Sequence, residues 1–306
     1  MLFIVAMSIL AQPISAASTP NLTLVWQSKF EGDAVIVSPG DIAIDGWGNV
    51  FVTTQSASLV KKFDAKGNFV TQWGGNGKGE GKFSLSFGLA IDADNNVYVG
   101  DFYNKLIQKF DNDGKFLMQW ANEPSTSPAF LAIDAAGNIY ANEFPPHDEH
   151  YVQKFDSDGK LLSEWGNKDD VFGSRTEDIV LDKHGNLYIT DPLKHRVQKL
   201  DPDGKLLATF GGKSSKDGNG KFMGPFGIAV DTDDNIYVLD VNFLQKLDAW
   251  GNPIAQWTTK GGDLDAASNV TIDAEGNLYL FAKADVTAVT GKSVHVFVLK
   301  KFSQTK

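Results

Sequence analysis

The fold of this chain is decided by residues 87–120, FGLAIDADNNVYVGDFYNKLIQKFDNDGKFLMQW. Four runs of five or six residues, rich in β-branched and aromatic types, are separated there by turns of Gly, Asn and Asp. Such runs predict β-strands, and none shows the period of an amphipathic helix. The first two runs are apolar on both faces, which is typical of strands buried between neighbouring sheets. The stretch therefore predicts one small four-stranded antiparallel sheet.

The same unit recurs along the chain. An aromatic residue returns every 45 to 47 residues, at Trp26, Trp73, Trp120, Trp165, Phe210 and Trp257. A second ladder of Asp-x-x-x-Asn tracts ends at Asn49, Asn96, Asn138, Asn186, Asn235 and Asn277. A period of this size indicates a propeller or solenoid array.

The two repeating patterns are offset at the ends of the chain. Trp26 has no Asp-x-x-x-Asn tract before it, and the tract ending at Asn277 has no aromatic after it. The simplest arrangement pairs the first strand, 22–29, with 294–302, which closes the array into a ring and hides its edges. We therefore predict an all-β fold, a six-bladed β-propeller of four-stranded antiparallel blades in which the N-terminal strand joins the last blade. A single domain would span residues 22–303.

A second type of turn also repeats. Tracts that start at Asp64, Asp111, Asp156, Asp201 and Asp248 all place Gly fourth. Gly suits a hairpin position with positive φ, and Asp accepts a backbone N–H. Three of them read Asp-x-Asp-Gly, as a calcium loop begins, but the distant bidentate Glu is missing. We interpret them as structural turns.

Three blocks recur in this order: Gly-[Ile/Leu]-Ala-[Val/Ile]-Asp, Gly-Asn-[Ile/Val/Leu]-Tyr-[Val/Ile]-x-Asp and [Ile/Val/Leu]-Gln-Lys-[Phe/Leu]-Asp-x-Asp-Gly. Residues 226–231 and 191–200 are close to the pattern. Over about residues 22–302 these blocks resemble NHL repeats, and the Gly-His and Trp-Asp signature of WD40 repeats is missing. The resemblance implies a six-bladed propeller used chiefly for binding, with a minority of enzymes.

The overall charge limits the partners. The chain has 306 residues, a formal net charge of −10 and no Cys. An acidic surface repels phosphate backbones and anionic lipid, so we expect neither nucleic acid nor a membrane surface as partner. The absence of Cys excludes disulfides, thiol catalysis and thiolate metal sites.

Residues 1–17 combine a short apolar run with a small-residue stretch, which predicts a signal peptide and an exported protein. The alternatives are an uncleaved N-terminal anchor or a misassigned start codon, because the segment carries no Lys or Arg before the apolar run.

In such a ring the short Asp-rich hairpins lie on one face, and the irregular connections lie on the other, which we call the loop face. The connections between second and third strands are predicted to be expanded loops at 144–150 and 283–293. Variable loops on a rigid scaffold are the usual place for recognition, so the loop face is the predicted site for a protein, peptide or small ligand. The candidate residues on it are Tyr103, Phe144, His147, His150, Arg175, Asp178, His195, Arg196 and Phe243.

His147, His150 and His195 are also candidate metal ligands. The alternative is a polar exposed loop, which we favour because no helix holds the two His of 144–151 on one face. Zinc or calcium is compatible with the chain, but the sequence requires no cofactor.

A ring of side chains is expected at the mouth of the central channel. It comprises Asp41, Phe87, Phe130, Glu177, Asp178, Phe226 and Asn269. Aromatic and carboxylate groups together can hold a small ligand or cation. The alternative for the Phe side chains is packing between blades.

The leading hypothesis is a ligand- or protein-binding module without catalytic residues. The resemblance also implies an alternative, a metal-dependent enzyme similar to the peptidyl-hydroxyglycine amidating lyases or to lactonases. The lyases bind zinc through channel His residues, whereas Gly88, Phe130, Asp178 and Gly227 stand at the matching positions here. Lactonase-like propellers hold calcium through carboxylates and Asn, which Asp178, Glu177 and Asn269 could supply. NHL propellers also occur in ubiquitin ligases and receptor kinases, but this chain has no RING or kinase segment.

Overall fold

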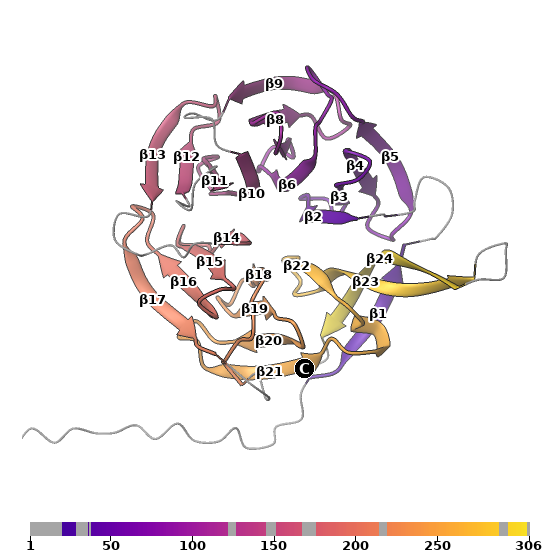
Figure 1. Cartoon of the computed structure of the whole chain (residues 1–306), viewed down its shortest axis with the longest axis vertical. Helices are drawn as coiled ribbons and strands as arrows, with labels where there is room; N and C mark the ends of the chain where they lie inside the picture. The colour runs from indigo at the N-terminus through magenta and orange to yellow at the C-terminus, as the bar shows by residue number, and fades with distance from the viewer. Residues whose placement is uncertain are drawn as a thin grey trace, which may run out of the picture.

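The computed structural model describes residues 20–28, 36, 38–121, 127–144, 151–166, 176–213, 219–287 and 293–304. These residues form six four-stranded antiparallel sheets arranged in a ring (Figure 1). The predicted six-bladed β-propeller is confirmed. No helix in these ranges has the length and hydropathy needed to cross a bilayer.

Each blade runs from an inner strand at the channel to an outer strand at the rim (Figure 1). Blade 1 contains β2 (Pro39–Ile44), β3 (Val50–Thr54), β4 (Leu59–Phe63) and β5 (Phe69–Gly74). Blade 2 contains β6 (Ser86–Ile91), β7 (Val97–Asp101), β8 (Leu106–Phe110) and β9 (Phe116–Ala121). Blade 3 contains β10 (Ser127–Ile133), β11 (Ile139–Phe144), β12 (Tyr151–Phe155) and β13 (Leu161–Gly166).

The second half of the ring has the same plan. Blade 4 contains β14 (Ile179–Leu181), β15 (Leu187–Asp191), β16 (Arg196–Leu200) and β17 (Leu206–Gly211). Blade 5 contains β18 (Gly227–Val230), β19 (Ile236–Leu239), β20 (Phe243–Leu247) and β21 (Pro253–Thr258). The 3₁₀ helix η3 (Gly262–Leu264) precedes blade 6, which contains β22 (Ser268–Ile272), β23 (Leu278–Thr287), β24 (Ser293–Gln304) and β1 (Leu22–Gln27).

The ring closes through its two ends. Strand β1 pairs antiparallel with β24, with Leu22 opposite Gln304 and Leu24 opposite Phe302. Figure 1 shows the indigo β1 beside the yellow β24. The predicted closure by the N-terminal strand is therefore confirmed, and its physical effect is that β24 has no free edge along this stretch.

One sequence-based expectation about blade 6 is wrong. The stretch from Lys283 to Ser293 was expected to be an expanded irregular loop, but β23 and β24 continue pairing as far as Thr287 opposite Ser293. The two long strands form a ribbon that leaves the ring at one side (Figure 1). Regular alternation in this stretch favours continued pairing over a loop.

The core lies between blades rather than inside any one of them. One cluster combines Tyr237 and Leu244 of blade 5 with Leu278, Leu280 and Phe302 of blade 6. All six of the described clusters mix side chains of adjacent blades in this way. Each large apolar side chain buried there contributes about 1.5–3 kcal/mol, so the blades stabilise one another.

Five of the six recurring aromatic residues pack on a Gly in the next blade. Trp73, on the outer strand of blade 1, packs on Gly114 in the outer hairpin of blade 2. A Cβ at Gly114 would stand 2.6 Å from the indole ring, and its φ of 86° favours Gly. Trp26, Trp120, Trp165 and Phe210 pack in the same way on Gly67, Gly159, Gly204 and Gly251. The recurrence of an aromatic residue every 45 to 47 positions thus reflects one such contact for each of these five pairs of adjacent blades.

The Asp-x-x-x-Asn tracts hold the inner hairpins. In blade 6 the Asp273 carboxylate accepts hydrogen bonds from the Asn277 backbone, the Asn277 side chain and the Tyr279 hydroxyl. Lys301 lies 3.3 Å from the same carboxylate and 4.9 Å from the Tyr279 ring centroid. Blades 2 to 5 repeat this Asp, Asn, Tyr and Lys network. The network satisfies charges that are half-buried at the hairpin face.

Candidate functional site

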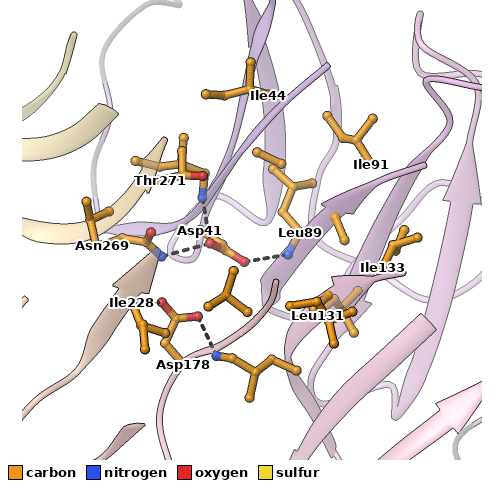
Figure 2. Close-up of a pocket in the computed structure, with 18 residues that line it drawn as sticks. Asp41, Ile44, Leu89, Ile91, Leu131, Ile133, Asp178, Ile228, Asn269 and Thr271 are labelled. Carbon is orange, nitrogen blue, oxygen red and sulfur yellow. Dashed lines mark hydrogen bonds between the residues drawn. The ribbon is translucent and has the colours of Figure 1, made fainter. Parts of the chain in front are cut away.

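The central channel contains a cavity of about 230 Å³ between the inner strands. Half-buried aliphatic side chains line the part nearer the hairpin face, among them Ile44, Ile91, Ile133 and Leu181. Toward the loop face it is lined by Asp41, Asp178 and Asn269, which Figure 2 shows around one common space. The inner strands run from the loop face to the hairpin face, so these polar groups lie at the end of the cavity nearer the loops, where all three are buried.

Asp41 joins three blades. Its Oδ1 accepts hydrogen bonds from the Ile42 backbone N–H at 2.8 Å and from the Asn269 side-chain amide at 2.9 Å. Its Oδ2 accepts from the Leu89 backbone N–H of blade 2 at 2.8 Å (Figure 2). Its own backbone N–H donates to Thr53 Oγ1. The carboxylate is therefore held in one orientation at the channel.

Asp178 repeats this geometry in blade 4. Its two oxygens accept from the backbone N–H groups of Ile179, at 2.8 Å, and of Ile228 in blade 5, at 2.9 Å. Its backbone N–H donates to Thr190 Oγ1, as that of Asp41 does to Thr53. The two halves of the ring thus contribute equivalent carboxylates to one channel.

Both carboxyl groups bind protons more tightly than usual. Burial raises the pKa of Asp41 from 3.8 to about 6, although three hydrogen bonds oppose the change. Burial also raises the pKa of Asp178, and the negative charge of Asp41 raises it further. Two like charges in one small cavity resist simultaneous ionisation, so the channel carries titratable charge near neutral pH.

These residues by themselves do not fit a resident metal ion. Asp41 Oδ1 already accepts two hydrogen bonds, and every other oxygen of the two carboxylates accepts one. Within the described ranges no group of three or more His, Cys, Asp or Glu side chains could hold a metal. Calcium takes six to eight oxygen ligands, far more than this set offers.

An aromatic row leads away from the channel mouth on the loop face. Phe130 packs against Phe87 with ring centroids 5.1 Å apart, Phe87 lies 5.8 Å from Phe102, and Phe102 lies 5.3 Å from Tyr103. Phe130 is buried, whereas Tyr103 is 66% exposed. The Phe side chains are buried or half-buried and contribute to the packing between blades, whereas Tyr103 is the exposed end of the row.

Three exposed apolar side chains lie where blades 4 and 5 meet. Leu193, Met223 and Val241 are 58%, 43% and 53% exposed. Gly224 lies close to both of the other loops. A Cβ built on it would stand 3.7 Å from Val241 Cγ2 and 3.9 Å from Pro192 Cβ. The three side chains come from three segments of the chain: Leu193 and Val241 from loops within blades, and Met223 from the connection between blades.

The backbone under this surface is fixed by one buried carboxylate. Asp240 accepts hydrogen bonds at 2.8 Å from the backbone N–H groups of Met223, Gly224 and Val241. The Asn242 side-chain amide also contacts Met223 Sδ at 3.2 Å. A single buried Asp therefore positions both Met223 and Val241.

The sequence-predicted residues occupy separate parts of the loop face. His195 Nδ1 lies 2.6 Å from the Met223 carbonyl oxygen, so a protonated Nδ1 donates to it and that nitrogen is not a free metal ligand. Arg196 pairs with the buried Asp191 at 2.9 Å. Phe243 is half-buried at the start of β20, and Tyr103 lies on the blade 2 loop.

The remaining candidates are less defined. Phe144 ends β11, and Asp178 lies in the channel. His147, His150 and Arg175 fall outside the described residues. The predicted metal site of His147, His150 and His195 therefore stays a prediction.

Sequence reasoning missed Leu193, Met223 and Val241 as exposed residues. They stand out in the sequence only as apolar residues in segments where turns are otherwise polar. It also missed the equivalence of Asp41 and Asp178, although both precede an apolar strand that ends in Asp.

Comparisons with known proteins agree with this architecture. The sequence model of the NHL repeat matches residues 88–110, which form most of three strands of blade 2. No curated protein matches the chain in sequence.

Solved structures that resemble it include virginiamycin B lyase from Staphylococcus aureus, with 15% identity, a TM-score of 0.62 and coverage of 93% of this chain and 98% of that chain. A gluconolactonase from Xanthomonas campestris has 15% identity and a TM-score of 0.64, covering 94% and 92%. The WD40 repeats of RRP9 have 11% identity and a TM-score of 0.60, covering 91% and 84%. At such identities the likeness concerns the fold alone. The chain is therefore a six-bladed β-propeller that carries an NHL repeat in its second blade.

Proposed function

We propose that this propeller is a binding module that holds a peptide or protein ligand on its loop face. The observation that carries the proposal is the meeting of Leu193, Met223 and Val241 at the junction of blades 4 and 5, with about half of each side chain exposed. Contiguous apolar patches on a soluble protein mark interaction sites, whereas single exposed apolar residues are ordinary.

The hairpin face offers no equivalent surface in the described ranges. Its Asp side chains are engaged by the backbone of their own turns, as Asp64 is by Lys66 and Asn68. Trp47 and Trp250 are strongly exposed there, but they belong to blades 1 and 5, which blade 6 separates. Recognition through several neighbouring side chains is therefore better supported on the loop face.

A matched pair of surface variants tests this proposal. One variant combines Tyr103→Ser, Leu193→Ser and Val241→Ser on the loop face, and the other combines Trp47→Ser and Trp250→Ser on the hairpin face. Peptide arrays are probed with both variants and with the wild type, after thermal unfolding has shown that all three are folded. The loop-face variant is expected to lose ligands that the hairpin-face variant keeps. Equal binding by the loop-face variant and the wild type would contradict the proposal.

A second candidate function is a propeller lyase or hydrolase whose metal would need ligands in addition to Asp41 and Asp178. The observation in its favour is the pair of buried carboxylates with raised pKa values, Asp41 and Asp178, in the channel. Solved lyase and gluconolactonase structures share the fold. Metal analysis of the dialysed protein separates the two functions. Stoichiometric zinc or calcium that Asp178→Asn removes would favour the enzyme over the binding module.

The proposal includes export, for which the support is the composition of residues 1–17. N-terminal sequencing of the protein from its native cells tests it. A mature protein that begins after Ala16 or Ala17 supports export with cleavage, and one that retains Met1 argues against cleavage.

A further inference from the structure

One position on the inner strands divides the ring into two similar halves. It is the fourth residue before the Asp that begins each inner hairpin. In blades 1 to 6 this position holds Asp41, Gly88, Phe130, Asp178, Gly227 and Asn269. Blades 1 to 3 thus carry Asp, Gly and Phe, and blades 4 to 6 carry Asp, Gly and Asn. The two halves differ only where Phe130 stands in place of Asn269.

This difference changes the hydrogen bonding of the two carboxylates. Asp41 and Asp178 each accept one N–H from the next residue and one from the next blade. Asp41 accepts a third hydrogen bond, at 2.9 Å, from the Asn269 side chain in the preceding blade. The blade that precedes Asp178 offers Phe130 instead, a side chain without a donor. Among the described residues, therefore, no side chain donates to Asp178 as Asn269 donates to Asp41.

The Phe130 ring is used elsewhere. It is buried and packs against Phe87, with ring centroids 5.1 Å apart. A carboxylate has about four acceptor positions, and two hydrogen bonds leave part of that capacity open at Asp178. Figure 2 shows Asp178 and Asp41 beside the same space. A ligand in the cavity that carries N–H groups can therefore complete the hydrogen bonding of Asp178.

The cavity also lacks a positive charge. Among the described residues that line it, none is Lys, Arg or His. Burial raises the pKa of Asp178, and the negative charges of Asp41 and Glu177 raise it further. These shifts express the free-energy cost of ionised carboxylates that have no cation beside them. A bound cation would offset that cost.

The size and lining of the cavity favour an organic cation. A calcium ion needs six to eight oxygen ligands, whereas an alkylammonium group needs only acceptors for its three N–H bonds. At about 30 Å³ for each water molecule, a cavity of about 230 Å³ has room for roughly seven or eight heavy atoms. Half-buried aliphatic side chains such as Ile44 and Ile91 line the part nearer the hairpin face. A short carbon chain fits beside them.

We infer that the central channel binds a small primary alkylamine, with its ammonium group at Asp41 and Asp178 and its carbon chain toward the hairpin face. This site is separate from the loop-face surface of Leu193, Met223 and Val241. A Lys side chain carries the same ammonium group, but one inserted from the loop face would place its carbon chain at the opposite end, away from Ile44 and Ile91. The lining therefore favours a free amine over a peptide Lys.

Isothermal titration of the full folded chain tests the inference at about pH 8, where an alkylamine is still protonated. The probes are n-butylammonium, tetramethylammonium, which has the charge without N–H groups, and n-butanol, which has the chain without the charge. A peptide with blocked ends and one Lys represents the other source of an ammonium group, and calcium and zinc represent metal ions. The variants are Asp41→Asn and Asp178→Asn. The control, Asp203→Asn, removes the same charge from an exposed hairpin residue.

One n-butylammonium ion is expected to bind each wild-type chain, and the Asp203→Asn control should bind it equally. Binding should be about tenfold weaker or worse for each channel variant, for tetramethylammonium and for n-butanol. Equal binding of tetramethylammonium or n-butanol, an equal loss in the control, or no binding of n-butylammonium would overturn the inference. Tighter binding of the Lys peptide, or stoichiometric calcium or zinc in place of the amine, would overturn it as well.

A second measurement on the wild type does not depend on the stability of the variants. In carbon-13 NMR spectra, n-butylammonium should shift the carboxyl signals of Asp41 and Asp178 and leave that of Asp203 unchanged. Unchanged Asp41 and Asp178 signals would contradict binding in the channel. The peptide arrays described above examine the loop face, so failure of the amine to bind and failure of the loop-face proposal are separate results.

Discussion

Asn269 donates its side-chain amide to Asp41 Oδ1 over 2.9 Å and so joins the inner strand of the last blade to that of the first. At the rim the same closure is made by β1 on β24, and Trp257 Nε1 donates to the Pro20 carbonyl oxygen at 2.7 Å. The ring is thus closed at two radii by contacts between residues more than 200 positions apart. The stability of a propeller depends on such contacts because no covalent bond closes it.

Deletion of residues 20–28 should strongly destabilise the protein. The change removes the β1 pairing, exposes the edge of β24 and leaves Gly67 and Tyr279 without the Trp26 ring. We expect the free energy of unfolding to fall by about 3 kcal/mol or more, as for loss of a packed Trp. Calorimetry measures it. The control is Val25→Ser, since Val25 is 51% exposed, and an unchanged melting temperature after the deletion would contradict the closure.

Gly114→Ala should cost more stability than Gly137→Ala. The two residues have φ values of 86° and 82°, so the backbone strain is matched. A Cβ at Gly114 meets the Trp73 ring, whereas one at Gly137 meets nothing within 4 Å. We expect a loss of about 1 kcal/mol at Gly137 from strain, and roughly 1–3 kcal/mol more at Gly114 from overpacking. Urea unfolding compares them, and equal losses would mean that the aromatic contact does not restrict position 114.

Tyr279→Phe should reduce stability by about 1 kcal/mol at neutral pH, because it removes the hydrogen bond to the Asp273 carboxylate. Burial alone would raise the pKa of Asp273, but the Asn277 and Tyr279 hydrogen bonds and Lys301 outweigh it and hold that pKa below 3.8. Stability from a lowered pKa is present above the unfolded value and is lost as the pH falls through the folded value. The difference between variant and wild type should therefore shrink in acid.

Chemical unfolding at several pH values measures this difference. Tyr103→Phe, at an exposed hydroxyl, is the matched control and should have no effect. A Tyr279→Phe difference that stayed constant into acid would show that packing, and not the carboxylate, is responsible.

Asp41→Asn should lower the pKa of Asp178, since it removes one of the three causes that raise it. The remaining causes, burial first and then the negative charge of Glu177, keep that pKa above 3.8. A raised carboxyl pKa contributes stability that is complete below the unfolded value and declines as the pH rises toward the folded value, about 6 for Asp41. The wild type should thus lose stability between about pH 4 and 6 through this pair, and the variant should lose less.

Carbon-13 NMR of the Asp carboxyl groups measures these titrations directly. Asp178→Asn is the reciprocal variant, and its Asp41 signal should shift in the same direction. If neither substitution changed the titration of the other residue, the two carboxylates would not share an electrostatic environment.

The sequence alone determined the number of blades, their order and the closure of the ring. Trp73 and the other members of its ladder mark each contact between blades, and Asn277 and its equivalents mark each inner hairpin. Each marker consists of a few neighbouring residues and recurs in every blade. Local patterns and turn chemistry are therefore sufficient to recognise it.

Only the tertiary structure decided what each copy does with its side chains. In blade 1, Phe51 replaces the repeated Tyr, and Lys62 reaches across to Asn112 Oδ1 at 2.6 Å instead of contacting Asp45. The channel shared by Asp41 and Asp178 and the surface of Leu193, Met223 and Val241 are likewise formed between blades. Their distances depend on the curvature of the ring and on how neighbouring sheets pack, which no local stretch of sequence encodes. The strand pattern therefore predicts the fold, while the candidate site exists only where distant strands and loops meet.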